Sequence, residues 1–105
     1  MTHTAAYCIE YFRAYPGKTA ALQAALVALA KKAKKEEGYL QYDVLQDQKD
    51  PRLFILVLKY RDQTAMTAHE QQAYILEFAE QHMPSLCEKC YWHDANPVCT
   101  ADQSK

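Results

Sequence analysis

The sequence predicts a small α+β domain of the ferredoxin-like βαββαβ type, with a four-stranded antiparallel sheet and two helical regions. Three observations support this fold class. The 105 residues fit one domain and leave no room for a second. Strand and helix patterns follow one another in the order strand, helix, strand, strand, helix, strand. One of the strands is apolar on both faces, which indicates a second protein surface against the sheet.

The first part of the chain is predicted to form a strand and a long helix. Residues 5–15 alternate as a strand does, with faces formed by Tyr7, Ile9 and Tyr11 and by Ala6, Cys8, Glu10 and Phe12. Pro16 and Gly17 end this strand with turn chemistry. From Lys18 to Glu36 the apolar residues recur at helical spacing as Leu22, Leu26, Leu29 and Ala33. Gly38 is expected to end the helix as a C-cap residue.

Two strands joined by a hairpin loop are predicted next. They span Tyr39 to Gln46 and Arg52 to Tyr60, with a loop over residues 47–51. The centre of the third strand, Leu53 to Leu58, is apolar without alternation, so it is expected to be buried on both faces. Helices can cover only one face in so short a chain. The other face is therefore predicted to meet a second copy, as a homodimer.

The last third is predicted to contain a second helical region and a short strand. Asp62 is an N-cap candidate for a helical region running to about Cys87, and Pro84 is expected to bend or shorten its last turn. Its inner stripe consists of Ile75, Ala79, Met83 and Leu86, with Leu76 and Phe78 adjacent. Lys89 to Asp94 would form the fourth strand. The domain is thus expected over residues 1–95, followed by a polar tail over residues 96–105.

The composition excludes several classes of partner. The formal net charge is −1 and arginine occurs only at positions 13, 52 and 61, so no nucleic-acid partner is expected. No apolar run is long enough to span a bilayer, so no membrane partner is expected either. The N-terminus lacks the pattern of a secretory signal, which makes the cytoplasm the expected location. The four cysteines are expected to be reduced there.

Three stretches taken together resemble the antibiotic biosynthesis monooxygenase family. They are Tyr15–Lys18, Glu36–Asp47 and Tyr60–His69, and the resemblance extends over roughly residues 5–95. It implies a dimeric α+β barrel in which two sheets pack face to face, with a pocket in each subunit between sheet and helices. The second stretch looks most like enzymes that process a phosphorylated autoinducer signal. The family also includes quinol monooxygenases and haem-degrading enzymes, but Glu10, Tyr60 and Ala79 stand where the haem-degrading set of Asn, Trp and His is expected.

Two residues are candidates for catalysis. His69 matches the family's histidine, and an imidazole can take a proton from an acidic C–H or O–H group. Alternatively, His69 caps or packs a helix at the pocket edge. Glu10 would have a raised pKa if it faced an apolar pocket, and it could then act as a base. Alternatively, it is a charge at a strand edge that reaches solvent.

The substrate-binding wall is predicted to consist of Tyr60, Tyr74, Phe54 and Leu58. Tyr60 occupies the family's aromatic position, although an ordinary buried tyrosine is the alternative. Leu58 and Tyr74 stand where the family often has a glutamate and a second histidine, which leaves a non-catalytic role open.

Thiols and imidazoles are clustered near the C-terminal end of the sequence. His82, Cys87, Cys90 and His93 have the spacing H-x4-C-x2-C-x2-H, and such groups can hold tetrahedral zinc. A Cys-x-x-Cys pair can also carry out redox chemistry, but such pairs usually begin a helix, whereas this one follows a helix end. Reduced thiols without a metal are the expectation here.

The leading functional prediction is a cofactor-independent monooxygenase for a small quinol, phenol or polyketide-like substrate. His69 or Glu10 would deprotonate the substrate, and the family resemblance implies that the resulting anion reacts directly with O2. One alternative is an isomerase of a small phosphorylated dicarbonyl, which would need Lys59 or Arg61 to bind the phosphate. The other is a non-catalytic dimeric module that binds a small ligand.

Overall fold

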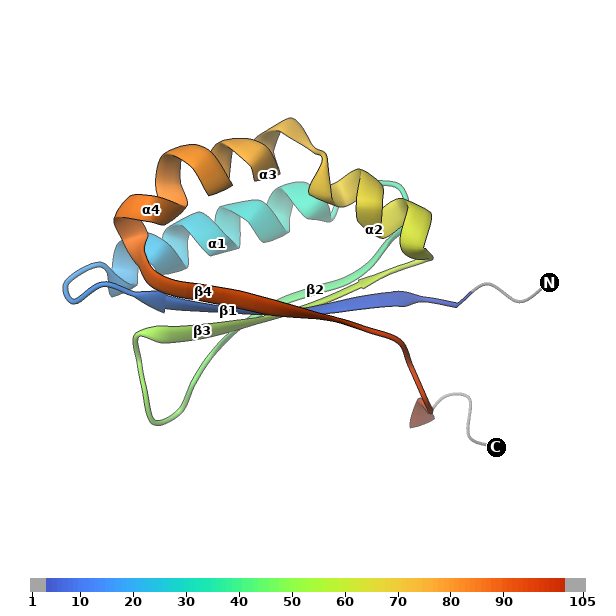
Figure 1. Cartoon of the computed structure of the whole chain (residues 1–105), viewed down its shortest axis with the longest axis horizontal. Helices are drawn as coiled ribbons and strands as arrows, with labels where there is room; N and C mark the ends of the chain where they lie inside the picture. The colour runs from blue at the N-terminus through green and yellow to red at the C-terminus, as the bar shows by residue number, and fades with distance from the viewer. Residues whose placement is uncertain (1–3, 102–105) are drawn as a thin grey trace.

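A four-stranded antiparallel sheet carries every described helix on one face in the computed structural model, which describes residues 4–101 (Figure 1). The elements are β1 (Ala6–Ala14), α1 (Thr19–Ala33), β2 (Tyr39–Gln46), β3 (Leu53–Tyr60), α2 (Gln63–Glu70), α3 (Ala73–Glu77), the π-helical turn η1 (Phe78–His82), α4 (Met83–Leu86) and β4 (Cys87–Ala95). The strand order is β2-β3-β1-β4. The ferredoxin-like fold is therefore confirmed. Residues 1–3 and 102–105, which include the end of the predicted tail, lie outside the described residues.

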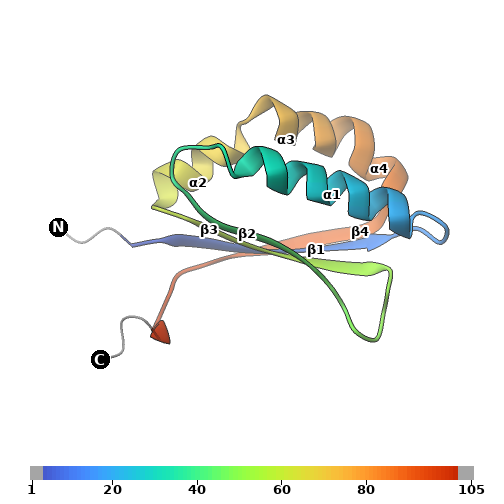
Figure 2. The ribbon, with the colours of Figure 1, turned by 180° about the vertical axis from the view of Figure 1, so that it is seen from behind.

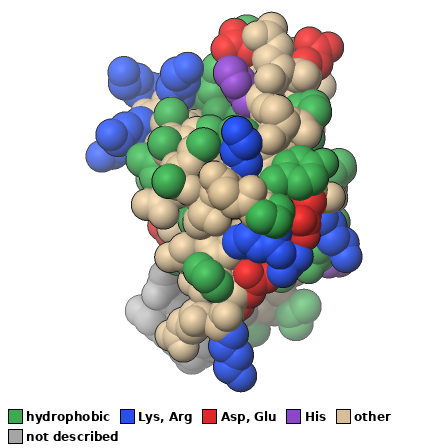
Figure 3. Space-filling view, turned by 90° about the vertical axis from the view of Figure 1, so that its left-hand side faces the viewer, with side chains coloured by type: hydrophobic (Ala, Val, Ile, Leu, Met, Phe, Trp, Pro, Cys, Tyr) green, Lys and Arg blue, Asp and Glu red, His purple; other side chains and the backbone are tan. Residues whose placement is uncertain are grey.

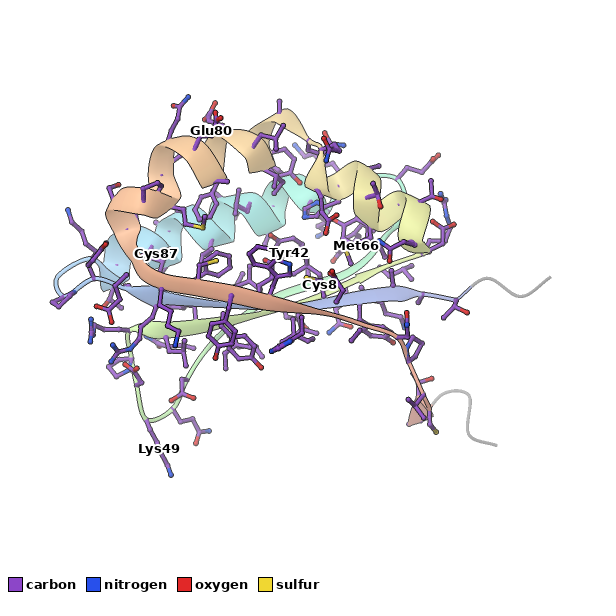
Figure 4. The ribbon with its side chains drawn as sticks, in the orientation of Figure 1. Cys8, Tyr42, Lys49, Met66, Glu80 and Cys87 are labelled. Carbon is purple, nitrogen blue, oxygen red and sulfur yellow. The ribbon has the colours of Figure 1, made fainter. Side chains whose placement is uncertain are left out.

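The hydrophobic core lies between the sheet and the helical layer. The predicted stripe of α1 is confirmed, because Leu22, Leu26, Leu29 and Ala33 are all buried. Alternate residues of β1 and β3 meet this stripe from below, among them Cys8, Phe12, Phe54, Leu56 and Leu58. Figure 4 shows Cys8, Tyr42 and Met66 directed into this layer. The alternation of period two in the strands and the spacing of the helix thus bury one common face.

The second helical region is not the continuous helix that the sequence predicts. Asp62 caps α2 as expected, since its Oδ1 accepts a hydrogen bond of 2.9 Å from the backbone N–H of Ala65. The helix then stops, because Gln72 adopts an extended conformation. A π-helical turn precedes Pro84, whose ring cannot donate a backbone hydrogen bond. Within η1, Phe78 is buried, whereas Ala79, which was predicted to lie in the inner stripe, is exposed.

The helix α1 ends three residues earlier than predicted, at Ala33 rather than Glu36, and its C-cap is Lys34. Gly38 lies in the turn that follows and has a φ of +88°. A Cβ atom at this position would lie 2.5 Å from the Cβ of Ala65, so the turn packs closely against α2. This early end removes Glu36 from the helix and allows its side chain to turn inward.

Ion pairs lie at the end of the sheet where the β2–β3 hairpin is located, and they connect this hairpin with the end of β1 and the start of β4. Arg13 pairs with Asp50 at 2.8 Å and with Glu88, and Arg52 pairs with Glu88 at 3.1 Å. Figure 3 looks onto this end of the molecule, where basic and acidic side chains adjoin one another. Because all four side chains keep solvent contact, these pairs contribute modestly to stability.

The opposite face of the sheet is uncovered by any described element, as the two ribbon views show (Figures 1 and 2). Ile9 pairs with Val57 and Tyr11 with Ile55 on this side, and all four remain partly exposed. The neighbouring apolar side chains, Leu45 and Tyr91, are exposed as well. We call this surface the open face. None of the described helices is both long and apolar enough to cross a membrane.

Candidate active site

A cavity of about 420 Å³ opens between the sheet and the helical layer. Its lining is mostly apolar and aromatic, and comprises Glu10, Phe12, Leu29, Tyr42, Leu58, Met66, His69, Glu70, Ile75, Leu76, Phe78, Ala79, Met83, Cys90, Trp92 and Asp94. This volume lies within the range of sites for small organic ligands. The polar groups in the lining are three carboxylates, one imidazole, one thiol, one phenol and the indole N–H of Trp92. The cavity therefore combines an apolar wall with groups that can exchange protons.

A buried histidine and carboxylate lie together at one side of this cavity. His69, on the inner side of α2, is only 3% exposed, and Glu36, from the turn after α1, is 10% exposed. The Nδ1 atom of His69 lies 3.0 Å from each carboxylate oxygen of Glu36. A carboxylate accepts hydrogen bonds, so Nδ1 carries a proton, and in a neutral ring the lone pair is then on Nε2.

The free nitrogen of His69 is the one available to a ligand. All ring hydrogen bonds that His69 makes within the described residues are made by Nδ1. No buried side-chain nitrogen or oxygen atom in this part of the chain lacks a partner. Nε2 makes no hydrogen bond with the described residues, and the ring of His69 borders the cavity. A base held by a carboxylate in this way is a common arrangement for proton transfer.

Two tyrosines complete the hydrogen bonding of Glu36. The hydroxyl of Tyr60 donates to Oε1 of Glu36 at 2.9 Å and lies 2.9 Å from Nδ1 of His69, while the hydroxyl of Tyr74 donates to Oε2. Burial, followed by the neighbouring Glu36, raises the pKa of both Tyr60 and Tyr74. Both phenols thus remain protonated donors, and three donors hold the carboxylate in one position.

Glu10 extends into the cavity from β1. Burial raises the pKa of Glu10 to about 7, and the carboxylates of Glu70 and Asp94 add to this effect, whereas a hydrogen bond from the thiol of Cys8 opposes it. The Sγ atom of Cys8 lies 3.8 Å from Oε2 of Glu10. Glu10 can therefore gain and lose a proton near neutral pH, which an ordinary exposed glutamate does not do.

The predicted site residues fall into two groups. His69, Glu10 and Leu58 line the cavity. Tyr60, Tyr74 and Phe54 are not among its lining residues. The two tyrosines are hydrogen-bonded to Glu36, and Phe54 belongs to the buried core. The proposed substrate-binding wall therefore needs revision at these three positions.

Sequence reasoning did not identify Glu36, Glu70, Trp92 or Asp94 as site residues. The sequence predicts Glu36 at the end of a helix. Its position at the start of the second family-like stretch is the signal that points to a role in the site. For Trp92 and Asp94 the available signal is strand alternation, because alternate residues of a strand lie on one face of the sheet. In the structure β1 pairs with β4 so that Glu10 lies opposite Trp92 and Cys8 lies opposite Asp94.

The proposed zinc ligands do not converge. The ring of His93 packs against Tyr11 and Tyr91 on the open face, whereas Cys90 lines the cavity on the other side of the sheet. Within residues 4–101 no group of three or more histidine, cysteine, aspartate or glutamate residues is arranged to hold a metal ion. The four cysteines are free thiols in the structure.

These features define an α+β domain with a buried acid–base pair beside a small-molecule cavity. Residues 6–81 match the family described as antibiotic biosynthesis monooxygenase, and the chain belongs to this family. A comparison with curated proteins finds no match.

Several solved structures share the fold. The protein SO0527 from Shewanella oneidensis is 28% identical, with a TM-score of 0.88 over 91% of this chain and 93% of that chain. PA3566 from Pseudomonas aeruginosa is also 28% identical, with a TM-score of 0.86 over 94% and 99% of the two chains. Rv0793 from Mycobacterium tuberculosis is 22% identical, with a TM-score of 0.86 over 93% and 99%, and this likeness shows the fold alone.

Proposed function

We propose that this protein is a cofactor-independent monooxygenase that acts on a small quinol, phenol or polyketide-like substrate. The observation that carries the proposal is His69, whose Nδ1 is held 3.0 Å from a buried carboxylate and whose ring borders an apolar cavity. Membership of the monooxygenase family supports the same reaction class. The proposed substrate class and mechanism are argued from the residues of the site, because the family name alone does not specify them.

The reaction begins with the removal of a proton from a substrate hydroxyl by Nε2 of His69. Glu36 stabilises the imidazolium that forms, as a carboxylate does when it accepts a hydrogen bond from Nδ1. The substrate anion then transfers an electron to O2, and the two radicals combine to form a carbon–oxygen bond. With a naphthohydroquinone, one substrate and one O2 give one hydroxynaphthoquinone and one water. The substrate supplies all the electrons, and the imidazolium returns its proton when water leaves.

The isomerase alternative lacks support at the cavity. Lys59 and Arg61, the cations that were to bind a phosphate, are not among the lining residues. The ammonium of Lys59 lies 5.4 Å from the ring centroid of Tyr7, and Arg61 lies beside Glu37 and Asp62. The purely structural alternative would be favoured by a filled interior, whereas the cavity here has room for a ligand.

The test is oxygen transfer to 1,4-dihydroxynaphthalene under 18O2, with the product analysed by mass spectrometry. Wild-type protein should introduce one labelled oxygen atom faster than the spontaneous reaction, after dialysis against a chelator and without added flavin. His69→Ala should lower the rate about 100-fold or more, the usual effect of losing a general base. His82→Ala, at an exposed histidine outside the cavity, is the matched control and should retain the wild-type rate. Equal rates for the two variants would contradict the proposal.

Glu36 is a positioning residue in this scheme, because it acts through His69 and does not line the cavity. Glu36→Gln should therefore reduce kcat about tenfold or more while leaving KM nearly unchanged. It should also shift the pH at which activity is half-maximal. A change in KM alone would indicate a direct contact between Glu36 and the substrate.

We also infer that the protein is a homodimer that buries the open face. This face exposes Ile9, Tyr11, Ile55 and Val57 together with the stacked ring of Tyr91, 4.6 Å from that of Tyr11. A contiguous apolar surface of this kind on a small domain is typical of a subunit interface. Figure 4 shows a row of side chains extending from this face with no element beneath them. The family resemblance points to the same face-to-face pairing of sheets.

A further inference from the structure

The charges around the cavity are all of one sign. Glu10, Glu70 and Asp94 line it, and no lysine or arginine appears among its lining residues. Glu70 and Asp94 are exposed and Glu10 is partly buried, so the first two lie nearer the solvent side. Two carboxylates thus lie at the exposed part of the cavity lining, whereas His69 is buried.

The three carboxylates come close together because of the sheet register. Cys8 lies opposite Asp94 and Glu10 lies opposite Trp92, so Glu10 and Asp94 are diagonal neighbours on one face. Diagonal neighbours of an antiparallel pair are separated by roughly 7–8 Å. Glu70 approaches them from the end of α2, and its pKa is raised by burial and then by Asp94. The carboxylates thus act on one another and on any ligand between them.

Nearby cations are directed elsewhere. Lys59 lies over the ring of Tyr7 on the open face, and Lys32 lies 5.5 Å from the ring centroid of Tyr74, which is outside the cavity lining. Arg61 is within 4 Å of Glu37 and Asp62. The negative potential of the cavity is therefore not neutralised by a lining cation.

We propose that Glu70 and Asp94, together with Glu10, determine specificity by charge: the cavity accepts uncharged or cationic aromatic molecules and rejects anionic molecules of the same shape. The aromatic and apolar lining, which includes Trp92, Phe12 and Phe78, supplies the affinity for a ring. An aromatic carboxylate or phosphate would place a negative charge within about 8 Å of two or three carboxylates, which opposes binding. This inference rests on the proposed function only in taking the cavity as the substrate site.

The test uses three probes that share one ring system: 2-naphthol, 2-naphthoate and 2-naphthylmethylammonium. Their dissociation constants for the full chain are measured by isothermal titration calorimetry at pH 7.5. Naphthol and the ammonium compound should bind at least about tenfold more tightly than naphthoate at low ionic strength, and 0.5 M salt should reduce this ratio. The salt dependence separates a charge effect from a difference in shape.

The double variant Glu70→Gln/Asp94→Asn should tighten naphthoate binding about fivefold or more and leave naphthol binding nearly unchanged. The matched control is Glu37→Gln/Glu80→Gln, which removes two exposed carboxylates outside the cavity and should leave all three affinities unchanged. Figure 4 shows Glu80 on the outer side of the helical layer.

Three results would overturn the inference: naphthoate binding as tightly as naphthol, a ratio unaffected by the double variant, or no binding of any probe. Naphthol binding with the expected preference, but no oxygen transfer to dihydroxynaphthalene, would leave the inference standing and contradict the proposed monooxygenase reaction instead.

Discussion

Glu10 makes the stability of the protein depend on pH, and Glu10→Gln should remove that dependence. The ordinary pKa of a glutamate is 4.5, and burial raises the pKa of Glu10 to about 7 in the folded protein. Below pH 4.5 the carboxyl group is protonated in both states and costs nothing. Between pH 4.5 and 7 the folded protein retains the proton while the unfolded chain releases it, so stability falls as pH rises. Above pH 7 the full cost is present.

The magnitude follows from the difference between these two pKa values. At 1.36 kcal/mol for each pH unit, raising the pKa from 4.5 to about 7 corresponds to about 3 kcal/mol. Because the side chain retains some solvent contact, this figure is an upper bound. Glutamine has nearly the same shape and no charge, so the free energy of unfolding of Glu10→Gln relative to wild type should rise by up to this amount between pH 4.5 and pH 8.

The assay is urea unfolding followed by circular dichroism at several pH values from 4.5 to 8, at one fixed protein concentration. Glu80→Gln is the control for removing an exposed carboxylate. The reasoning is refuted if the difference in unfolding free energy between Glu10→Gln and wild type is constant across this range.

Three further predictions concern the fold and the interface. Gly38→Ala should destabilise the protein by about 2 kcal/mol or more, because it adds a steric clash at 2.5 Å to an unfavourable φ of +88°. Gly17→Ala, with a φ of +83° and no atom within 4 Å of the new Cβ, should cost only the backbone term of about 1 kcal/mol. Leu26→Ala, at a fully buried position of α1, should cost about 3 kcal/mol in urea unfolding, whereas Gln23→Ala on the exposed side should cost little. Val57→Asp places a charge on the open face and should change the mass found by light scattering from about twice 12.1 kDa to 12.1 kDa; an unchanged mass would contradict the proposed dimer.

The fold was predictable because the apolar residues recur with a clear helical or strand period within each element. The repeat of Leu22, Leu26 and Leu29 specifies one helix face, and the strand patterns specify which residues point toward it. The interruptions were not predictable to the same degree. Gln72 breaks the helical region by adopting an extended conformation, although neither glycine nor proline marks this point in the sequence.

Glu36 shows why part of the site was missed. A charged residue in the last turn of a predicted helix, beside several lysines, has the pattern of a solvated helix end. In the structure α1 ends at Ala33, and the side chain instead accepts hydrogen bonds from His69, Tyr60 and Tyr74. These partners lie 24 to 38 residues away in the sequence, so only the tertiary fold brings them together.

Leu58 and Tyr74, where the family resemblance implies a glutamate and a second histidine, do not argue against the proposed chemistry. The phenol of Tyr74, at the position of the second histidine, donates to Glu36 and so helps to hold the carboxylate that orients His69. Leu58 adds no charged group to the cavity wall, but the neighbouring strand β1 supplies the carboxylate of Glu10 to the same cavity. Because burial raises the pKa of Glu10 to about 7, this carboxylate can exchange a proton in the pH range in which an imidazole also acts. The cavity thus contains an imidazole and a carboxylate that can exchange protons, and this arrangement supports the proposed catalytic role over a merely structural one.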